Sequence, residues 1–133
     1  MRLIQIEGIG PSYAQKLANL GIRTTDQLLL EGATRQGRER ISEGTGISNK
    51  LILSWVNIAD LVRIPGIGEE YSDLLEESGI DTVLELRNRK PAHLHARLIE
   101  TNAQKKLVRR VPSLSEVTSW ISDAKKLPRA IYY

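Results

Sequence analysis

The chain has 133 residues, 41% of them hydrophobic, and a formal net charge of +3 at pH 7. This length can bury one sizeable core, and we expect one compact domain overall. The absence of cysteine excludes disulfides and thiolate metal sites, and no apolar run approaches membrane-spanning length. The residues before the first acid are too few for a signal peptide, so we expect a soluble, cytoplasmic protein without a membrane partner.

The first predicted element is a tight turn at Gly8 and Gly10, because glycine adopts backbone angles that other residues resist. Residues 1–7 are too few to form a helix in front of it. A helix should follow from Pro11 to Leu20, since proline is favoured at the first helical position. Gly21 is placed to end this helix in the left-handed conformation.

Three further helices are predicted in the first half. The Thr-x-x-Gln pattern over 24–27 is a capping box and predicts a short helix. A helix over 35–43 is expected to end at Gly44. Ser48 is placed to cap a longer helix, in which Trp55 belongs to an apolar face with residues spaced three and four apart.

The second half repeats the first at an offset of 58 residues. Of the 23 pairs that this offset makes between 6–28 and 64–86, 10 are identical, where chance would give one or two. Such self-similarity indicates two copies of one supersecondary unit. We therefore predict repeat 1 over 1–63 with its hairpin at 6–22, repeat 2 over 64–127 with its hairpin at 64–80, and a tail over 128–133.

The elements of repeat 2 follow the same plan. A helix over 91–101 is expected to stop at Asn102, and a helix over 116–126 carries Trp120. Four residues are assigned a structural role in hairpin 2: Gly66, Ile67, Gly68 and Gly79. No segment alternates like a half-buried strand, so the predicted fold class is all-α, with about eight to ten short helices.

Both tryptophans are predicted to be core residues. Repeat 1 lacks a helix before its hairpin, whereas no hairpin follows the helix of Trp120. By pseudo-symmetry we expect Trp120 to pack on hairpin 1 near Ile9 or Leu17, as Trp55 would pack on hairpin 2. Truncation before Ser113 would then destabilise repeat 1.

The segment Ile64-Pro65-Gly66-Ile67-Gly68, with Gly79-Ile80 after it, resembles the helix-hairpin-helix group, whose hairpin reads apolar-Pro-Gly-apolar-Gly. Over nearly its whole length the chain also resembles a bacterial and cyanobacterial family of uncharacterised proteins built from two such repeats. The typical Trp-Val-Asn-x-Ala-Asp-Leu run before the hairpin stands here within 55–71. The resemblance implies the fold and leaves the function open, because such hairpins bind DNA phosphates in some proteins and mediate assembly in others.

Candidate nucleic-acid contacts form two groups. The first is hairpin 1, where backbone amides at a helix start can hold an anion: Gly8, Ile9, Gly10, Ser12, Tyr13 and Lys16. The second is made of basic residues on or near the third helix of each repeat: Arg35, Arg38, Arg40, Arg87, Arg89, Lys90, Arg97, Lys105, Lys106, Arg109 and Arg110. Each group also has a simpler interpretation, as glycines that only make a turn and charges on a solvated face.

Hairpin 2 is a poorer anion site, because Glu69 and Glu70 stand at its helix start and repel phosphate. Residues 69–85 hold seven acids and no base, whereas 87–110 hold eight bases and one acid, so pairing between copies could form a homo-oligomer. His93 and His95 are two residues apart and point in different directions on a helix, which disfavours a metal site.

No sequence motif indicates catalysis, and no cofactor is predicted. We predict a non-enzymatic module that binds nucleic acid, as DNA without sequence specificity, through hairpin 1 and the basic helices. The alternative is a scaffold for protein–protein interaction and assembly without nucleic-acid binding.

Overall fold

The computed structural model describes residues 1–6 and 8–133. Within these ranges the fold is all-helical, as predicted, with eight α-helices, one short 3-10 helix and no strand. Two compact units are formed, one by Met1–Asp60 with Ala130–Tyr133 and the other by Leu61–Arg129. Glu7, which belongs to the first Ile-x-Gly-Ile-Gly pattern, lies outside the described residues.

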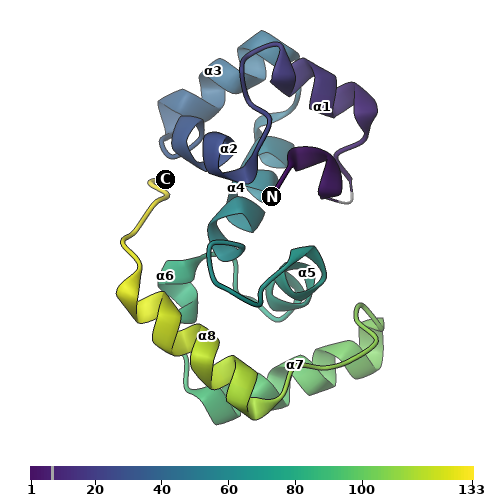
Figure 1. The fold of residues 1–133 in the computed structure, drawn as a ribbon, viewed down its shortest axis with the longest axis vertical. Coiled ribbons are helices and arrows are strands. Elements are labelled where there is room, and N and C mark those ends of the chain that lie inside the picture. Colours follow the sequence, from purple (N-terminus) through teal and green to yellow (C-terminus); the bar gives the residue numbers. More distant parts are fainter. Residues whose placement is uncertain (7) are drawn as a thin grey trace. The chain divides into compact units, whose positions relative to one another are not determined.

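Unit 1 consists of short helices (Figure 1), and three of them begin at side-chain caps. The Thr24 hydroxyl accepts a hydrogen bond from the Gln27 amide at 3.1 Å, which confirms the predicted capping box. Ser48 caps the last helix through the Leu51 amide at 3.2 Å. In chain order the elements are η1 (Leu3–Gln5), α1 (Pro11–Ala18), α2 (Thr25–Glu31), α3 (Arg35–Thr45) and α4 (Asn49–Leu61), whose last residue belongs to unit 2.

Helix α3 runs two residues beyond its predicted end. Its cap is Gly46, which has a left-handed φ of +75°, whereas Gly44 lies within the helix. The prediction of a stop at Gly44 was therefore wrong. A glycine inside a helix costs only about 1 kcal/mol relative to alanine, which does not by itself end the helix.

Unit 2 contains α5 (Glu69–Glu77), α6 (Val83–Leu86), α7 (Pro91–Lys105) and α8 (Leu114–Lys126). A capping box begins α8, with reciprocal bonds between Ser113 and Glu116. Helix α7 does not stop at Asn102. The Asn102 side chain instead bonds both backbone groups of Val108, and α7 ends at Lys105, with Lys106 as its C-cap at a φ of +51°.

The two predicted hairpin turns have matching backbone geometry. Gly8 and Gly66 have φ angles of +93° and +91°. In each turn the second isoleucine donates its amide to the carbonyl of the first, Ile9 to Ile6 and Ile67 to Ile64, both at 3.1 Å. The helix after each turn ends before a glycine with positive φ, as predicted for Gly21 and Gly79.

Each tryptophan is buried within its own unit. Trp55 is 4% exposed and packs on Tyr13, whereas Trp120 is 2% exposed and packs on Tyr71 in the core of unit 2. Their assignment to the core is confirmed. The expectation that Trp120 packs on hairpin 1 was wrong, because Trp120 belongs to the core cluster of unit 2 and contacts Tyr71 of the same unit.

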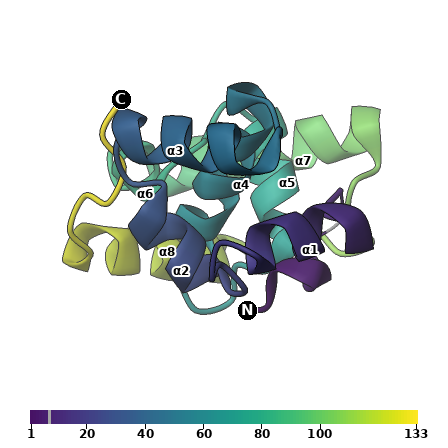
Figure 2. The same ribbon diagram turned by 90° about the horizontal axis from the view of Figure 1, so that it is seen from above.

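Residues 130–133 are not a loose tail. They belong to unit 1, where Ile131 is 3% exposed and the Tyr132 amide donates to the Ala33 carbonyl at 2.8 Å. Figures 1 and 2 both show this end of the chain beside α3. No periodic pattern could predict this packing, because the segment is extended and only four residues long.

Candidate nucleic-acid interface

Hairpin 1 presents the start of α1 without a side-chain cap. Gly10 is the N-cap residue and has no side chain, and Pro11 contributes no amide proton. The first helical hydrogen bond runs from Ala14 to the Gly10 carbonyl, so the amides of Ser12 and Tyr13 lie ahead of the hydrogen-bonded helix. Such a helix start is suited to an anion.

The side chains around hairpin 1 divide into exposed and internal ones. Ser12 and Lys16 are exposed, and the Lys16 ammonium lies 5.9 Å from the ring centroid of Tyr13. Ile9 is 2% exposed and anchors the turn, and its amide donates to the Ile6 carbonyl at 3.1 Å. The Tyr13 ring is half-buried on Trp55, with centroids 5.4 Å apart, which makes it a packing residue.

Hairpin 2 has the same turn geometry as hairpin 1, but the helix that follows it begins with acidic side chains. Glu69 and Glu70 form the first turn of α5, where they favour the positive end of the helix dipole. A phosphate placed there would meet both carboxylates. Ile67 is buried beneath the turn, and Gly68 is the N-cap residue.

The basic residues of α3 do not form one patch. Arg35 is exposed and lies 3.4 Å from the Glu39 carboxylate, and Arg40 is exposed. Arg38 is only 6% exposed, and its guanidinium donates to the carbonyls of Gly32 and Tyr132. Arg38 was therefore wrongly predicted to contact a ligand on the surface, since its helical position faces the α2–α3 turn.

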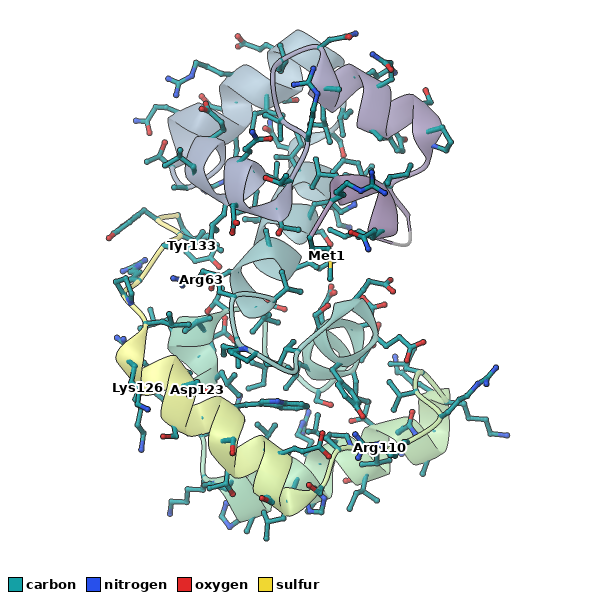
Figure 3. All side chains as sticks on the ribbon, viewed as in Figure 1. Met1, Arg63, Arg110, Asp123, Lys126 and Tyr133 are labelled. Carbon is teal, nitrogen blue, oxygen red and sulfur yellow. The ribbon has the colours of Figure 1, made fainter. Side chains whose placement is uncertain are left out.

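Two of the basic residues predicted as contacts in unit 2 are paired with carboxylates. Lys105 bonds Glu77 at 2.7 Å, and Arg110 makes two bonds to Glu116 at 2.6 and 3.0 Å. The second pair lowers the pKa of Glu116 to about 2, chiefly through the hydrogen bond from Arg110 and then through the Ser113 amide. Arg110 lies near one end of α8, far from Lys126 at the other (Figure 3).

A basic groove lies along the first turns of α7. It has a volume of about 530 Å³ and is lined by Asn88, Arg89, Lys90, His93, Leu94, Ala96, Arg97 and Glu100. Three of these side chains are permanently cationic at neutral pH and one is acidic. The groove therefore brings together predicted contacts Arg89, Lys90 and Arg97.

Arg97 is held in place at this groove. Its Nε donates to the Ser78 carbonyl at 2.7 Å, which orients the guanidinium. Sequence reasoning missed His93 and Asn88 as members of the site. His93 was considered only as a metal ligand, although its spacing of four from Arg97 on a helix could have placed it here.

The other predicted bases lie outside this groove. Arg87 is half-buried at the end of α6, and Lys106 and Arg109 are exposed on the segment after α7. Among residues 1–6 and 8–133, no group of three or more His, Asp or Glu side chains is placed to hold a metal ion. The helices of this described part are all too short or too polar to cross a bilayer.

Comparison with known proteins gives one family match. The model of a family described as a domain of unknown function, DUF4332, matches residues 7–127. A search of curated proteins and a search of solved structures returned no match.

Proposed function

The chain belongs to the DUF4332 family, and we propose that it is a non-enzymatic module that binds the phosphate backbone of nucleic acid. The observation that carries this proposal is the basic groove of α7. Arg89, Lys90 and Arg97 line one concave surface with a single carboxylate, Glu100. A phosphate chain would release counterions on entering such a groove, which favours binding without any base contact.

We further propose that the two units are helix-hairpin-helix repeats. The matching φ angles of Gly8 and Gly66 support this assignment, as do the equal hydrogen bonds that close the two turns. Hairpin 1 would add a second phosphate contact through the α1 amides and Lys16. Hairpin 2 would serve packing alone, because two carboxylates occupy its helix start.

The aromatic residues favour backbone contact over base stacking. Tyr13 and Tyr71 pack at a tilt against the buried tryptophans, and the α7 groove has no aromatic lining. Single-stranded nucleic acid is held largely by such stacking. Duplex DNA, read through its phosphates and without sequence specificity, is therefore the partner that this surface fits best.

Replacing the groove bases tests the proposal. The Arg89→Gln, Lys90→Gln double variant should bind DNA more weakly, and the salt slope of its log affinity should fall by about one per base removed. The Lys125→Gln, Lys126→Gln double variant removes the same charge from the exposed end of α8 and is the matched control. Equal weakening by both pairs would contradict the groove assignment and indicate a response to net charge alone.

The two hairpins can be tested in the same titration. Lys16→Glu should weaken binding, whereas Glu69→Lys with Glu70→Lys should leave the affinity equal or higher. Circular dichroism would verify that both variants keep their helix content. A wild-type affinity that is independent of Lys16 would remove hairpin 1 from the interface.

The alternative function is a scaffold for protein assembly. It is favoured by the acidic surface of α5, whose first turn carries Glu69 and Glu70. Pairing of this surface with the basic groove of another copy would give a homo-oligomer that dissociates in salt. Light scattering at low and high salt distinguishes this case, because the nucleic-acid module should keep one mass in both.

A further inference from the structure

An extended segment is held on unit 1 through its backbone. The Tyr132 amide donates to the Ala33 carbonyl at 2.8 Å, and the Tyr132 carbonyl accepts from Arg38 Nη2 at 3.0 Å. Both hydrogen-bonding groups of one residue are therefore used. Backbone recognition of this kind fixes an extended chain whatever its side chains are.

The side chains on either side of Tyr132 add selectivity. Ile131 is buried to 3% exposure, whereas the Tyr132 side chain is 51% exposed. The Arg38 guanidinium lies 5.8 Å from the ring centroid of Tyr133, whose hydroxyl donates to Asn57 Oδ1 at 3.4 Å. The position of Tyr133 can be followed in Figure 3. The surface thus selects an aliphatic residue and, two positions later, a tyrosine.

Unit 1 positions the receiving groups by itself. Arg38 Nη1 donates to the carbonyls of Gly32 at 2.8 Å and Ala33 at 3.2 Å, so the guanidinium is fixed by the α2–α3 turn. Preorganisation of this kind lowers the cost of binding a segment. Beyond the Tyr133 ring, a cavity of about 310 Å³ continues between α3 and α4, lined by Arg35, Arg38, Glu39, Asn49 and Leu53.

We propose that this surface of unit 1 is a docking site for an extended peptide of the Ile-Tyr-Tyr type, presented by a protein partner and occupied here in cis by residues 130–133. The cis segment resembles a bound ligand, because it contributes one buried anchor and a few polar contacts. The cis segment competes for the site at an effective concentration of about millimolar. A partner peptide must exceed this concentration, or the cis segment must be released first. This site is separate from the α7 groove, and the inference does not depend on nucleic-acid binding.

The test uses a chain in which the cis segment has lost its anchor. Ile131→Ser should vacate the site, and a labelled, amide-capped peptide with the sequence of residues 128–133 should bind this variant. Binding to the wild-type chain should be at least about tenfold weaker, because the cis segment competes. A peptide with serine in place of its isoleucine should not bind either chain.

Two variants of the Ile131→Ser chain locate the site. Arg38→Gln removes the donor to the segment and should abolish peptide binding, whereas Arg40→Gln, at an exposed position of α3 outside the cavity lining, should preserve it. Circular dichroism and thermal melting would show whether each chain is folded. Absence of peptide binding to a folded Ile131→Ser chain at millimolar concentration overturns the proposal.

A second measurement uses the unaltered protein, in case Ile131→Ser does not fold. The Tyr132 amide should be protected from hydrogen exchange by its bond to Ala33. Millimolar free peptide should displace the cis segment and accelerate this exchange, and the serine peptide should not. An exchange rate of Tyr132 that the peptide leaves unchanged contradicts a docking site.

Discussion

Tyr71 and Trp120 face each other with ring centroids 5.3 Å apart and an angle of 53° between the rings. Tyr13 and Trp55 repeat this arrangement in unit 1, at 5.4 Å and 60°. In each unit a tryptophan from a late helix therefore packs on the tyrosine of the hairpin helix. The contact joins segments that are about 40 to 50 residues apart in sequence and defines the core of each unit.

Removal of either tryptophan should destabilise the unit that holds it. Trp55→Ala and Trp120→Ala should each lower the free energy of unfolding by about 3–5 kcal/mol, since a large buried side chain is lost. Urea denaturation measures the loss, and Leu30→Ala, at a side chain 76% exposed, is the control with almost no effect.

Hydrogen exchange would assign each loss to a unit. Amides of α5 should lose protection in Trp120→Ala, and amides of α1 in Trp55→Ala. If Trp120→Ala accelerated exchange in α1 and left α5 unchanged, the result would support the predicted packing of Trp120 on hairpin 1. It would contradict the contact of Trp120 with Tyr71.

The helices could be predicted from sequence because their signals are local. Caps at Thr24, Ser48 and Ser113 lie within three residues of the amides that they bond. The partner of Trp120 could not be derived in this way, because pseudo-symmetry does not specify which hairpin a helix covers. The apolar face predicts burial of the indole and leaves its neighbour undetermined.

The candidate site shows the same division between local and distant information. The sequence places Arg38 close to other basic residues. Its guanidinium, however, donates hydrogen bonds to the carbonyls of Gly32 and Tyr132. The second of these bonds spans 94 residues, so no local pattern contains it. Arg97 lies in the α7 groove, where the carbonyl of Ser78, 19 residues earlier in the chain, orients its guanidinium.

The two hairpin glycines should differ in their tolerance of alanine. Gly8→Ala places a Cβ in open space and should cost about 1–2 kcal/mol, the strain of a left-handed backbone. A Cβ on Gly66 would lie 3.1 Å from Trp120 Nε1, so the indole must also shift. We expect Gly66→Ala to cost about 1–3 kcal/mol more, measured by urea denaturation. Equal losses would show that the Trp120 ring is not held against the turn.

Glu116 should titrate well below the ordinary pKa of a glutamate side chain. Its pKa of about 2 lies below the usual 4.5 because Arg110 and the Ser113 amide bond the ionised carboxylate. The depressed value means that the stabilisation is complete above about pH 4.5 and is lost as pH falls toward 2. NMR titration of the carboxyl carbon measures this directly, and Arg110→Gln should move the midpoint upward. A wild-type midpoint near 4.5 would show that the Arg110 pair is not formed in solution.

The most direct test of the proposed function is the salt dependence of binding by the wild-type chain to duplex DNA of arbitrary sequence. If Arg89, Lys90 and Arg97 each contact a phosphate, log affinity should fall linearly with log salt concentration, with a slope of about −3. Duplexes of different sequence should give the same slope and affinity. No measurable binding at low salt, with the protein folded, would contradict the account and favour the protein scaffold.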